Sequence, residues 1–206
     1  MSEELILYTN PQSRGAMAHW MLEEVGCPYR IDVKAFGRDM KAPDYLAINP
    51  MGKVPAIKHG NAIVTETGAI LSYLADAFPA AKLAPPPGER GAYYRWLFFV
   101  AGPCEAALSN KAAGWDPATP ELQGRFGYGS YQLTIDTIAK AVEGKRYIAG
   151  DHFTAADLYV ASFLNFGMMF NVIEKRPVFE AYVKPHIERP AAVRAQQKAD
   201  QLAKPG

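Results

Sequence analysis

The stretch Thr65-Glu66-Thr67-Gly68 combines hydroxyls, a carboxylate and a helix start, because an apolar helical pattern follows it. A hydroxyl and free N–H groups at a helix N-terminus bind a carboxylate well. The Glu66 carboxylate beside them suits an ammonium group. A simpler reading makes Thr65 or Thr67 an ordinary helix N-cap.

A second stretch, NPMGKVPAI at residues 49–57, places a proline where the apolar pattern indicates a strand. Proline has no N–H to donate to a ladder, so a central strand should exclude it. With the Val54–Pro55 bond in cis, Val54 can offer its N–H and C=O to an extended peptide as to an added strand. The alternative is a proline that protects an edge strand from aggregation. A short peptide that carries both a carboxylate and an ammonium group suits Val54, Glu66 and Thr67 together.

The elements that position these residues alternate between strand and helix. Short apolar runs bounded by turn residues predict the strands, and apolar spacing of three and four predicts the helices. Strands are expected at residues 5–8, 29–33, 54–58 and 62–64, and helices at residues 13–25 and 67–78. This order, β-α-β and then β-β-α, predicts an α/β unit with one mixed sheet.

A proline-rich break separates this unit from a second half in which the strand signal mostly vanishes. The predicted division is residues 1–81, a linker at residues 82–88, and an all-helical domain at residues 89–206. Helices are expected at residues 89–113 with a break at Gly102-Pro103, at residues 122–142, and in short pieces broken at Pro177, Pro185 and Pro190.

The clearest local signal in the second half is DHFTAADLYVASFL, residues 151–164. Thr154 and Asp157 fit a capping box, and Phe153 and Leu158 are placed to staple across the helix start. We favour this capping role for Asp157 over a role as an acid catalyst.

The composition limits the classes of partner and cofactor. Lys and Arg number 22 against 21 Asp and Glu, a formal charge of +1, so we expect no nucleic-acid and no membrane partner. No stretch approaches the roughly 20 apolar residues of a membrane helix, and the N-terminus lacks a signal-peptide pattern. Cys27 and Cys104 form no CxxC motif, and the histidines lack metal-ligand spacing. We expect a reduced, cytoplasmic protein without a metal.

Taken together, the order and spacing of NPMGKVPAI, TETGAILSYLADAFP, the proline-rich linker and GDHFTAADLYVASFL resemble the cytosolic glutathione transferase family. The resemblance covers nearly the whole chain. It implies a thioredoxin-like first domain with a cis Pro55, and a helical second domain that contributes the electrophile pocket. It implies that Val54 pairs with the cysteinyl backbone of glutathione, that Glu66 and Thr67 hold the γ-glutamyl end, and that Lys53 approaches the glycyl carboxylate.

The resemblance also places Ser13, in NPQSRGAMAHW, at the family's catalytic position. Its role there is to donate a hydrogen bond that keeps the glutathione thiol ionised. The alternative is that Ser13 only caps the helix it precedes. The stretch lacks a tyrosine at this position, the cysteine of the bacterial beta class and the SSxS run of the zeta class. The class therefore stays open, as does the donor, with Tyr8, Asn10, Gln12 or backbone N–H groups as alternatives.

The leading hypothesis is a transferase of the detoxification type, in which bound glutathione attacks a small hydrophobic electrophile. Glutathione is its co-substrate, and a homodimer is expected from the resemblance. Trp115 and residues 166–170, including Met168 and Met169, are candidates for lining an apolar pocket. The alternatives are glutathione-dependent peroxide or disulfide reduction, and a non-catalytic glutathione-binding or scaffold protein.

Overall fold

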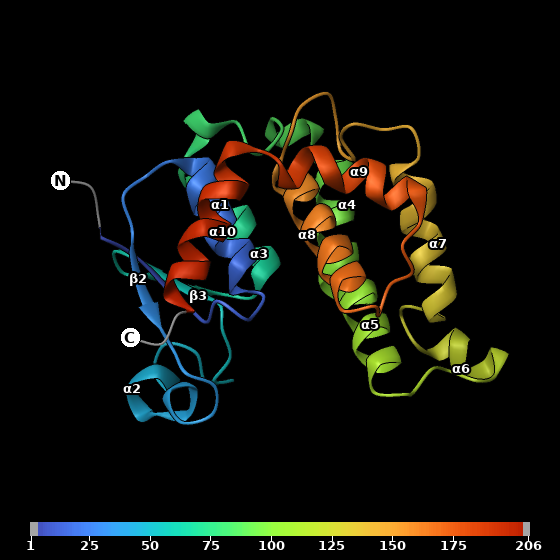
Figure 1. The fold of residues 1–206 in the computed structure, drawn as a ribbon, viewed down its shortest axis with the longest axis horizontal. Coiled ribbons are helices and arrows are strands. Elements are labelled where there is room, and N and C mark those ends of the chain that lie inside the picture. Colours follow the sequence, from blue (N-terminus) through green and yellow to red (C-terminus); the bar gives the residue numbers. More distant parts are fainter. Residues whose placement is uncertain (1–3, 204–206) are drawn as a thin grey trace. The chain divides into compact units, whose positions relative to one another are not determined.

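A computed structural model describes residues 4–203, which form two compact units (Figure 1). Unit 1 contains the chain up to Leu83 together with the chain from Arg189 onward, and unit 2 contains Ala84–Glu188. The expected division placed all of residues 89–206 in the helical domain. The structure instead groups the last helix with the first unit, because that helix packs on the first helix of the chain.

Unit 1 is built on a four-stranded mixed sheet with the strand order β2-β1-β3-β4. β1 pairs parallel to β2 and antiparallel to β3, and β3 pairs antiparallel to β4. The strands are β1 (Leu5–Thr9), β2 (Arg30–Val33), β3 (Ala56–His59) and β4 (Ala62–Thr65). The helices are α1 (Gly15–Val25), α2 (Pro43–Leu46), α3 (Thr67–Ala77) and α10 (Pro190–Leu202). The predicted thioredoxin-like α/β unit with one mixed sheet is confirmed.

The two faces of this sheet bury different residues. Ile6 and Tyr8 of β1 form one buried cluster with Tyr45 of α2, and Val54 packs against it. Because side chains alternate along a strand, Leu5 and Leu7 point to the opposite face. That face is covered by α1 and α3, which contact each other as well as the sheet.

In unit 2, every regular element among the described residues is helical. The helices are α4 (Gly91–Phe99), α5 (Glu105–Ala112), α6 (Pro120–Arg125), α7 (Tyr131–Val142), α8 (Ala155–Met169) and α9 (Pro177–Ile187). The all-helical prediction is confirmed. A π-helical turn at Val100–Cys104 separates α4 from α5, as the Gly102-Pro103 pair predicted.

Two expected helix boundaries are wrong. The single helix expected at residues 122–142 is divided into α6 and α7, because Gly129 adopts a φ of 67° and the Ser130 side chain caps α7 by accepting from the Leu133 N–H. Pro185 was expected to break a helix, but α9 continues through it to Ile187. A proline inside a helix removes one backbone bond and does not always end the helix.

The capping box at the start of α8 is confirmed. Asp157 is fully buried and accepts from the Thr154 N–H at 2.9 Å, the Ile148 N–H at 2.7 Å and the Tyr182 hydroxyl at 2.8 Å. These bonds join α8, α9 and the segment before α8. The contacts of Asp157 are therefore structural, as expected.

Helix α10 packs along α1 (Figure 1). The face of α10 that is buried consists of small residues. The buried residues of α10 are Ala191, Ala192, Ala195 and Ala199. Alanine methyl groups bury little apolar area, so the apolar part of this contact is modest.

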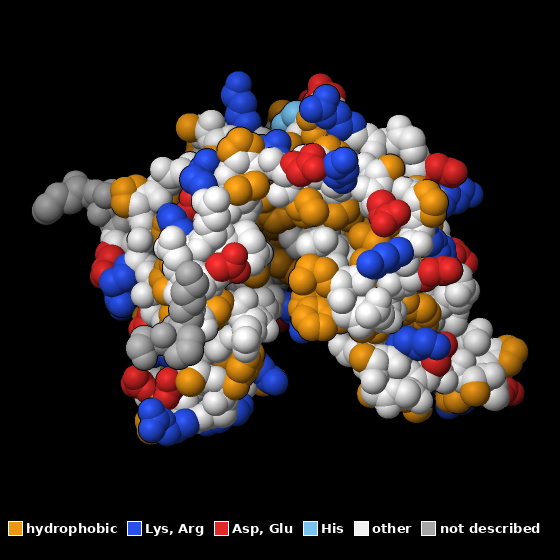
Figure 2. Space-filling model, viewed as in Figure 1, with side chains coloured by type: hydrophobic (Ala, Val, Ile, Leu, Met, Phe, Trp, Pro, Cys, Tyr) orange, Lys and Arg blue, Asp and Glu red, His pale blue; other side chains and the backbone are white. Residues whose placement is uncertain are grey.

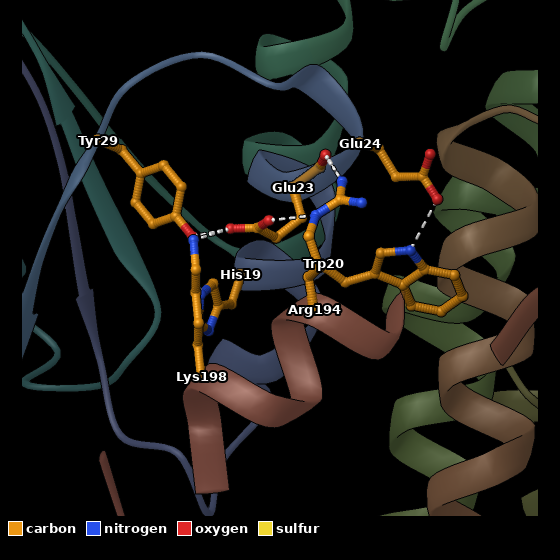
Figure 3. A network of polar contacts seen from close by, with 7 residues as sticks. All are labelled: His19, Trp20, Glu23, Glu24, Tyr29, Arg194 and Lys198. Atoms are coloured by element: carbon orange, nitrogen blue, oxygen red, sulfur yellow. Dashed lines mark hydrogen bonds and ion pairs between the residues drawn. The ribbon is translucent and has the colours of Figure 1, made fainter. Parts of the chain in front are cut away.

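Polar contacts complete the junction between α1 and α10 (Figure 3). The Glu23 carboxylate, 7% exposed, accepts from Lys198 Nζ at 2.5 Å, from Arg194 Nε at 3.0 Å and from the Tyr29 hydroxyl. The Tyr29 oxygen in turn contacts His19 Nε2 at 2.9 Å. One carboxylate thus joins α1, α10 and the residue before β2.

The neighbouring Glu24 makes a second set of contacts. Its carboxylate receives two bonds from Arg189, at 2.6 and 2.8 Å, and one from the Trp20 indole at 2.9 Å. Both acids lie in the last turn of α1, where the helix dipole disfavours negative charge. The positive charges of Arg189, Arg194 and Lys198 offset the free-energy cost of burying these two carboxylates.

We expect unit 1 to lose stability on acidification in two consecutive steps. Burial lowers the pKa of His19 below 6.5, so the unfolded chain binds a proton first and stability falls as the pH drops below about 6.5. Burial opposes ionisation of Glu23, but bonds from Lys198, Tyr29 and Arg194 outweigh it and lower its pKa from 4.5 to about 2. Its contribution is present above pH 4.5 and is lost as the pH falls toward 2.

Urea denaturation across this pH range measures both steps through the free energy of unfolding. His19→Gln should remove the upper step and Glu23→Gln the lower one. His152→Gln is the matched control, because the His152 side chain is 43% exposed and pairs with an exposed Asp151. An upper step that persists in His19→Gln contradicts the assignment.

Candidate active site

The strand register brings distant parts of unit 1 into one row across the sheet. Tyr8 of β1 lies opposite Asp32 of β2 on one side and Ala56 of β3 on the other. Ala56 in turn lies opposite Thr65 of β4. All four strands therefore reach the same edge of the sheet at this row.

Just beyond the row, the chain places most of the residues that the sequence singled out. β1 runs into the turn Asn10–Ser13, β3 is preceded by Val54 and Pro55, and β4 is followed by Glu66 and Thr67. Three segments far apart in the sequence are brought to one edge by the pairing alone.

The Val54–Pro55 peptide bond is cis, as the resemblance implied. Pro55 lies immediately before β3, which begins at Ala56, so the ladder never requires its missing N–H. Among residues 4–203, neither the N–H nor the C=O of Val54 has a hydrogen-bond partner. Both groups are therefore available to an added strand.

The loop that leads to Val54 is held by side chains around the Lys53 carbonyl. The Tyr45 hydroxyl donates to this oxygen at 2.6 Å and the Asn49 amide at 2.8 Å, while the Lys53 side chain is exposed. Gly52 has a φ of 58°, and a Cβ there would lie 2.5 Å from the Met40 carbonyl oxygen. Glycine is required at this position by both conformation and space.

The start of α3 lacks a side-chain cap and lies beside a carboxylate. Thr67 is the buried first residue of α3, and no side-chain hydrogen bond caps the helix, so neither Thr65 nor Thr67 acts as the N-cap considered above. The N–H groups of the first turn therefore have no helical acceptor. Glu66 is exposed and adopts φ 68° and ψ 122°, a sparsely populated conformation for a residue with a Cβ.

Ser13 is engaged within its own turn. Its hydroxyl donates to the Asn10 carbonyl at 2.7 Å and accepts from the Gly15 N–H at 3.0 Å. Ser13 thus satisfies a free N–H at the start of α1, which is the simpler of the two roles considered for it. A Cβ at Gly15 would lie 2.0 Å from Thr9 Oγ1, so the start of α1 fits tightly against the end of β1.

Two further polar residues, Tyr8 and Lys34, lie at this edge. The sequence indicated Tyr8 only as an alternative donor and did not indicate Lys34. Tyr8 packs in the same cluster as Val54, and its hydroxyl has no hydrogen-bond partner among residues 4–203. Lys34 follows β2, and its ammonium group lies 3.0 Å from Asp32 and 5.7 and 5.6 Å from the ring centroids of Tyr8 and Tyr45. The ends of two parallel strands meet at one edge, so the predicted β1–β2 pair could have indicated both residues.

Burial and charge shape the titration of this cluster. Burial, with smaller contributions from Tyr8 and Asp32, raises the pKa of Tyr45 to about 12. Tyr45 therefore remains a neutral donor to the Lys53 carbonyl at physiological pH, which keeps the loop before Val54 in place.

The apolar residues proposed for the pocket in unit 2 have mixed environments. Trp115 is 43% exposed and packs edge-on against Phe126, at 5.1 Å between ring centroids. Phe166 and Phe170 pack at 4.6 Å, whereas Met168 is buried in the core. Phe170 and Met169 are more than half exposed, so the end of α8 presents apolar side chains to solvent.

The remaining surface and cavity features of residues 4–203 do not point to a second site for the predicted chemistry. A hollow of about 650 Å³ in unit 2 is lined by residues of segments 142–146 and 177–185 and contains none of the predicted site residues. Acidic and basic side chains are interspersed on the face seen in Figure 2. Within residues 4–203, no helix is both long and apolar enough to span a bilayer, and no three His, Cys, Asp or Glu side chains gather as they would around a metal ion.

Comparisons with known families agree with this fold. Residues 3–76 match the description "Glutathione S-transferase, N-terminal domain" and residues 133–190 match "Glutathione S-transferase, C-terminal domain". Glutathione S-transferase 1 of Schizosaccharomyces pombe is 30% identical over 156 residues, covering 70% of this chain and 67% of the relative.

The chain belongs to the glutathione S-transferase family. Glutathione S-transferase GstA of Escherichia coli O157:H7 is 26% identical over 190 residues, covering 89% of this chain and 93% of GstA. A sphingomonad glutathione S-transferase solved in complex with glutathione has a TM-score of 0.77 and 26% identity, over 95% of this chain and 98% of that one. A glutathione S-transferase fold accounts for both the mixed sheet and the helical second unit.

Proposed function

We propose that this glutathione S-transferase activates the thiol of bound glutathione for attack on a small hydrophobic electrophile. The observation that carries the proposal is the convergence, at one sheet edge, of the unpaired Val54 backbone and the uncapped start of α3 beside Glu66. An added-strand site and an anion site next to a carboxylate match a short peptide with an ammonium and a carboxylate at one end. The γ-glutamyl group of glutathione has both.

Each part of glutathione has a proposed partner. The cysteinyl backbone pairs with Val54 next to the cis Pro55, and the γ-glutamyl carboxylate binds the first-turn N–H groups of α3 and Thr67. The γ-glutamyl ammonium pairs with Glu66. The glycyl carboxylate is proposed to approach Lys53, whose side chain is exposed. No metal takes part.

The proposed chemistry needs a donor that keeps the glutathione thiol ionised. A free thiol has a pKa of about 8.5, and each unit of depression requires about 1.4 kcal/mol of thiolate stabilisation. Ser13 is the proposed donor, which requires its hydroxyl to turn from the Asn10 carbonyl to the sulfur. Tyr8, in the cluster against which Val54 packs, is the alternative donor.

The class of second substrate is proposed from the side chains of unit 2. Exposed apolar side chains at the end of α8 suit a hydrophobic electrophile. Peroxide or disulfide reduction remains an alternative, since it uses the same thiolate. A non-catalytic glutathione-binding protein is the other alternative, since it needs the same binding residues and no donor to the thiol. The reaction requires reduced glutathione, which the cytosol supplies, so we place it in the cytoplasm.

The first test is an ultraviolet difference titration of glutathione bound to the wild type, Ser13→Ala and Tyr8→Phe. We expect a wild-type thiol pKa well below 8.5, because a hydrogen bond to the thiolate favours the ionised form. Ser13→Ala should raise it and Tyr8→Phe should leave it unchanged. The reverse pattern assigns the role to Tyr8, and bound glutathione with an ordinary thiol pKa leaves only a binding protein.

A second prediction uses the strained backbone of Glu66. Glu66→Gly should stabilise the fold by about 1 kcal/mol. It relieves backbone strain of order 1–3 kcal/mol, and this exceeds the cost of the additional conformational entropy that a glycine loses on folding. It should also weaken glutathione binding by roughly tenfold or more, since a charge-assisted bond is lost. Urea denaturation and calorimetric titration measure the two effects.

Lys82→Gly is the control for this prediction, because Lys82 has a φ of 54° and lies outside the proposed site. It should change stability without changing glutathione affinity. If Glu66→Gly binds glutathione as tightly as the wild type, the ammonium-binding role is lost.

The expected homodimer is also part of the proposal. Tyr94 and Phe98 are 41% and 69% exposed and lie one turn apart on α4, which places two large apolar side chains on one exposed face. Phe98→Lys should convert a dimer to a monomer in light scattering after size exclusion. Leu133→Lys, at a 60% exposed position on α7, should not. A monomeric wild type contradicts the proposal.

A further inference from the structure

We propose that Arg194 and Lys198 of α10 are positioning residues that hold α1, and with it the turn Asn10–Ser13, in the orientation needed for thiol activation. This inference rests on the proposed function, since bound glutathione is its readout. It concerns the last helix of the chain, which the sequence assigned to the other domain.

The small-residue face of α10 permits close approach but fixes register poorly. The buried residues of α10 are alanines, which provide no large side chain to insert between those of α1. Helix packing is ordinarily set by ridges that fit into grooves. A nearly flat alanine face leaves rotation and sliding of α10 on α1 weakly opposed.

The polar contacts supply the register that the apolar face lacks. Arg194 binds both the Glu23 carboxylate, through Nε at 3.0 Å, and the Glu23 carbonyl, through Nη2 at 3.1 Å. Lys198 reaches the other oxygen of the same carboxylate at 2.5 Å, and the Tyr29 oxygen at 3.3 Å. Four acceptor atoms at fixed positions define both the rotation and the axial position of α10 on α1 (Figure 3).

These contacts also decide how Glu23 itself is held. Its side chain is 7% exposed, whereas those of Arg194 and Lys198 are 50% and 48% exposed. If Glu23 is neutralised, the two cations can be hydrated where they stand. If the cations are neutralised, the buried carboxylate loses its charge partners and must move toward water to be solvated. The last turn of α1 moves with it.

A movement of α1 is transmitted to its other end because that end is tightly joined to the turn. The Gly15 N–H is bonded to Ser13 Oγ, and the Ala16 N–H to the Ser13 carbonyl. Gly15 also lies so close to Thr9 that no Cβ fits between them. A change in the orientation of α1 therefore displaces Ser13 relative to Val54, which is anchored separately through β3.

The test compares Arg194→Gln, Lys198→Gln and the double variant with the wild type in the full-length protein. Glutathione affinity is measured by calorimetry and the thiol pKa of bound glutathione by ultraviolet difference titration, both far below the unfolding temperature. We expect roughly tenfold weaker binding in the double variant and a thiol pKa closer to 8.5, as for other coupled sites. Asp200→Asn is the control, because Asp200 is exposed and accepts a hydrogen bond from Gln196 of the same helix at 2.8 Å.

The outcomes separate positioning from stability alone. If the variants unfold at lower temperature but bind glutathione with wild-type affinity and thiol pKa, the residues are only structural and the inference is overturned. If the Gln variants do not fold, Arg194→Lys decides, since it keeps the charge and loses the bond to the Glu23 carbonyl. Unchanged affinity and thiol pKa in Arg194→Lys then overturn the inference. Failure of the wild type to bind glutathione is instead a failure of the proposed function.

Discussion

The antiparallel register between β1 and β3 is the constraint on which the site depends. It sets Tyr8 opposite Ala56 and Leu7 opposite Ile57, and so brings the end of β1 next to the start of β3. A slip of one residue would turn Ile57, which is fully buried, toward the other face of the sheet. The buried faces on both sides make such a slip costly, so packing along the strands keeps the turn at Ser13 and the backbone of Val54 at the same end of the sheet.

Much of this arrangement could be predicted from local patterns. Pro55 inside an apolar run indicated an unusual backbone, and the structure shows a cis bond just before β3. Thr154 and Asp157 indicated a capping box because the signal lies within four residues. The division of residues 122–142 was also visible, since Gly127 and Gly129 stand between the two halves, but the apolar periodicity on either side outweighed them.

What could not be predicted depends on contacts between distant residues or on backbone strain. Glu23 and Glu24 bind basic residues that lie 165 to 175 positions later in the sequence, and no local pattern indicates such a pairing. The conformation of Glu66 is likewise not encoded in its type, because glycine or asparagine is the usual residue at positive φ. A glutamate kept there despite the strain is consistent with a carboxylate needed at that point, at the expense of stability.

The engagement of Ser13 in its own turn does not argue against a role for it in thiol activation, because the competing bonds differ in strength. The bond to the Asn10 carbonyl joins neutral groups and contributes about 1 kcal/mol, whereas a bond to a charged acceptor contributes about 1.5–3 kcal/mol. A thiolate within reach would therefore draw the hydroxyl away from the carbonyl. The Asn10 carbonyl would keep its bond from the Ser13 N–H at 3.1 Å, so it would not be left without a donor. Ser13 Oγ would still accept the hydrogen bond from the Gly15 N–H, so this bond at the start of α1 would remain while the hydroxyl proton turned to the sulfur.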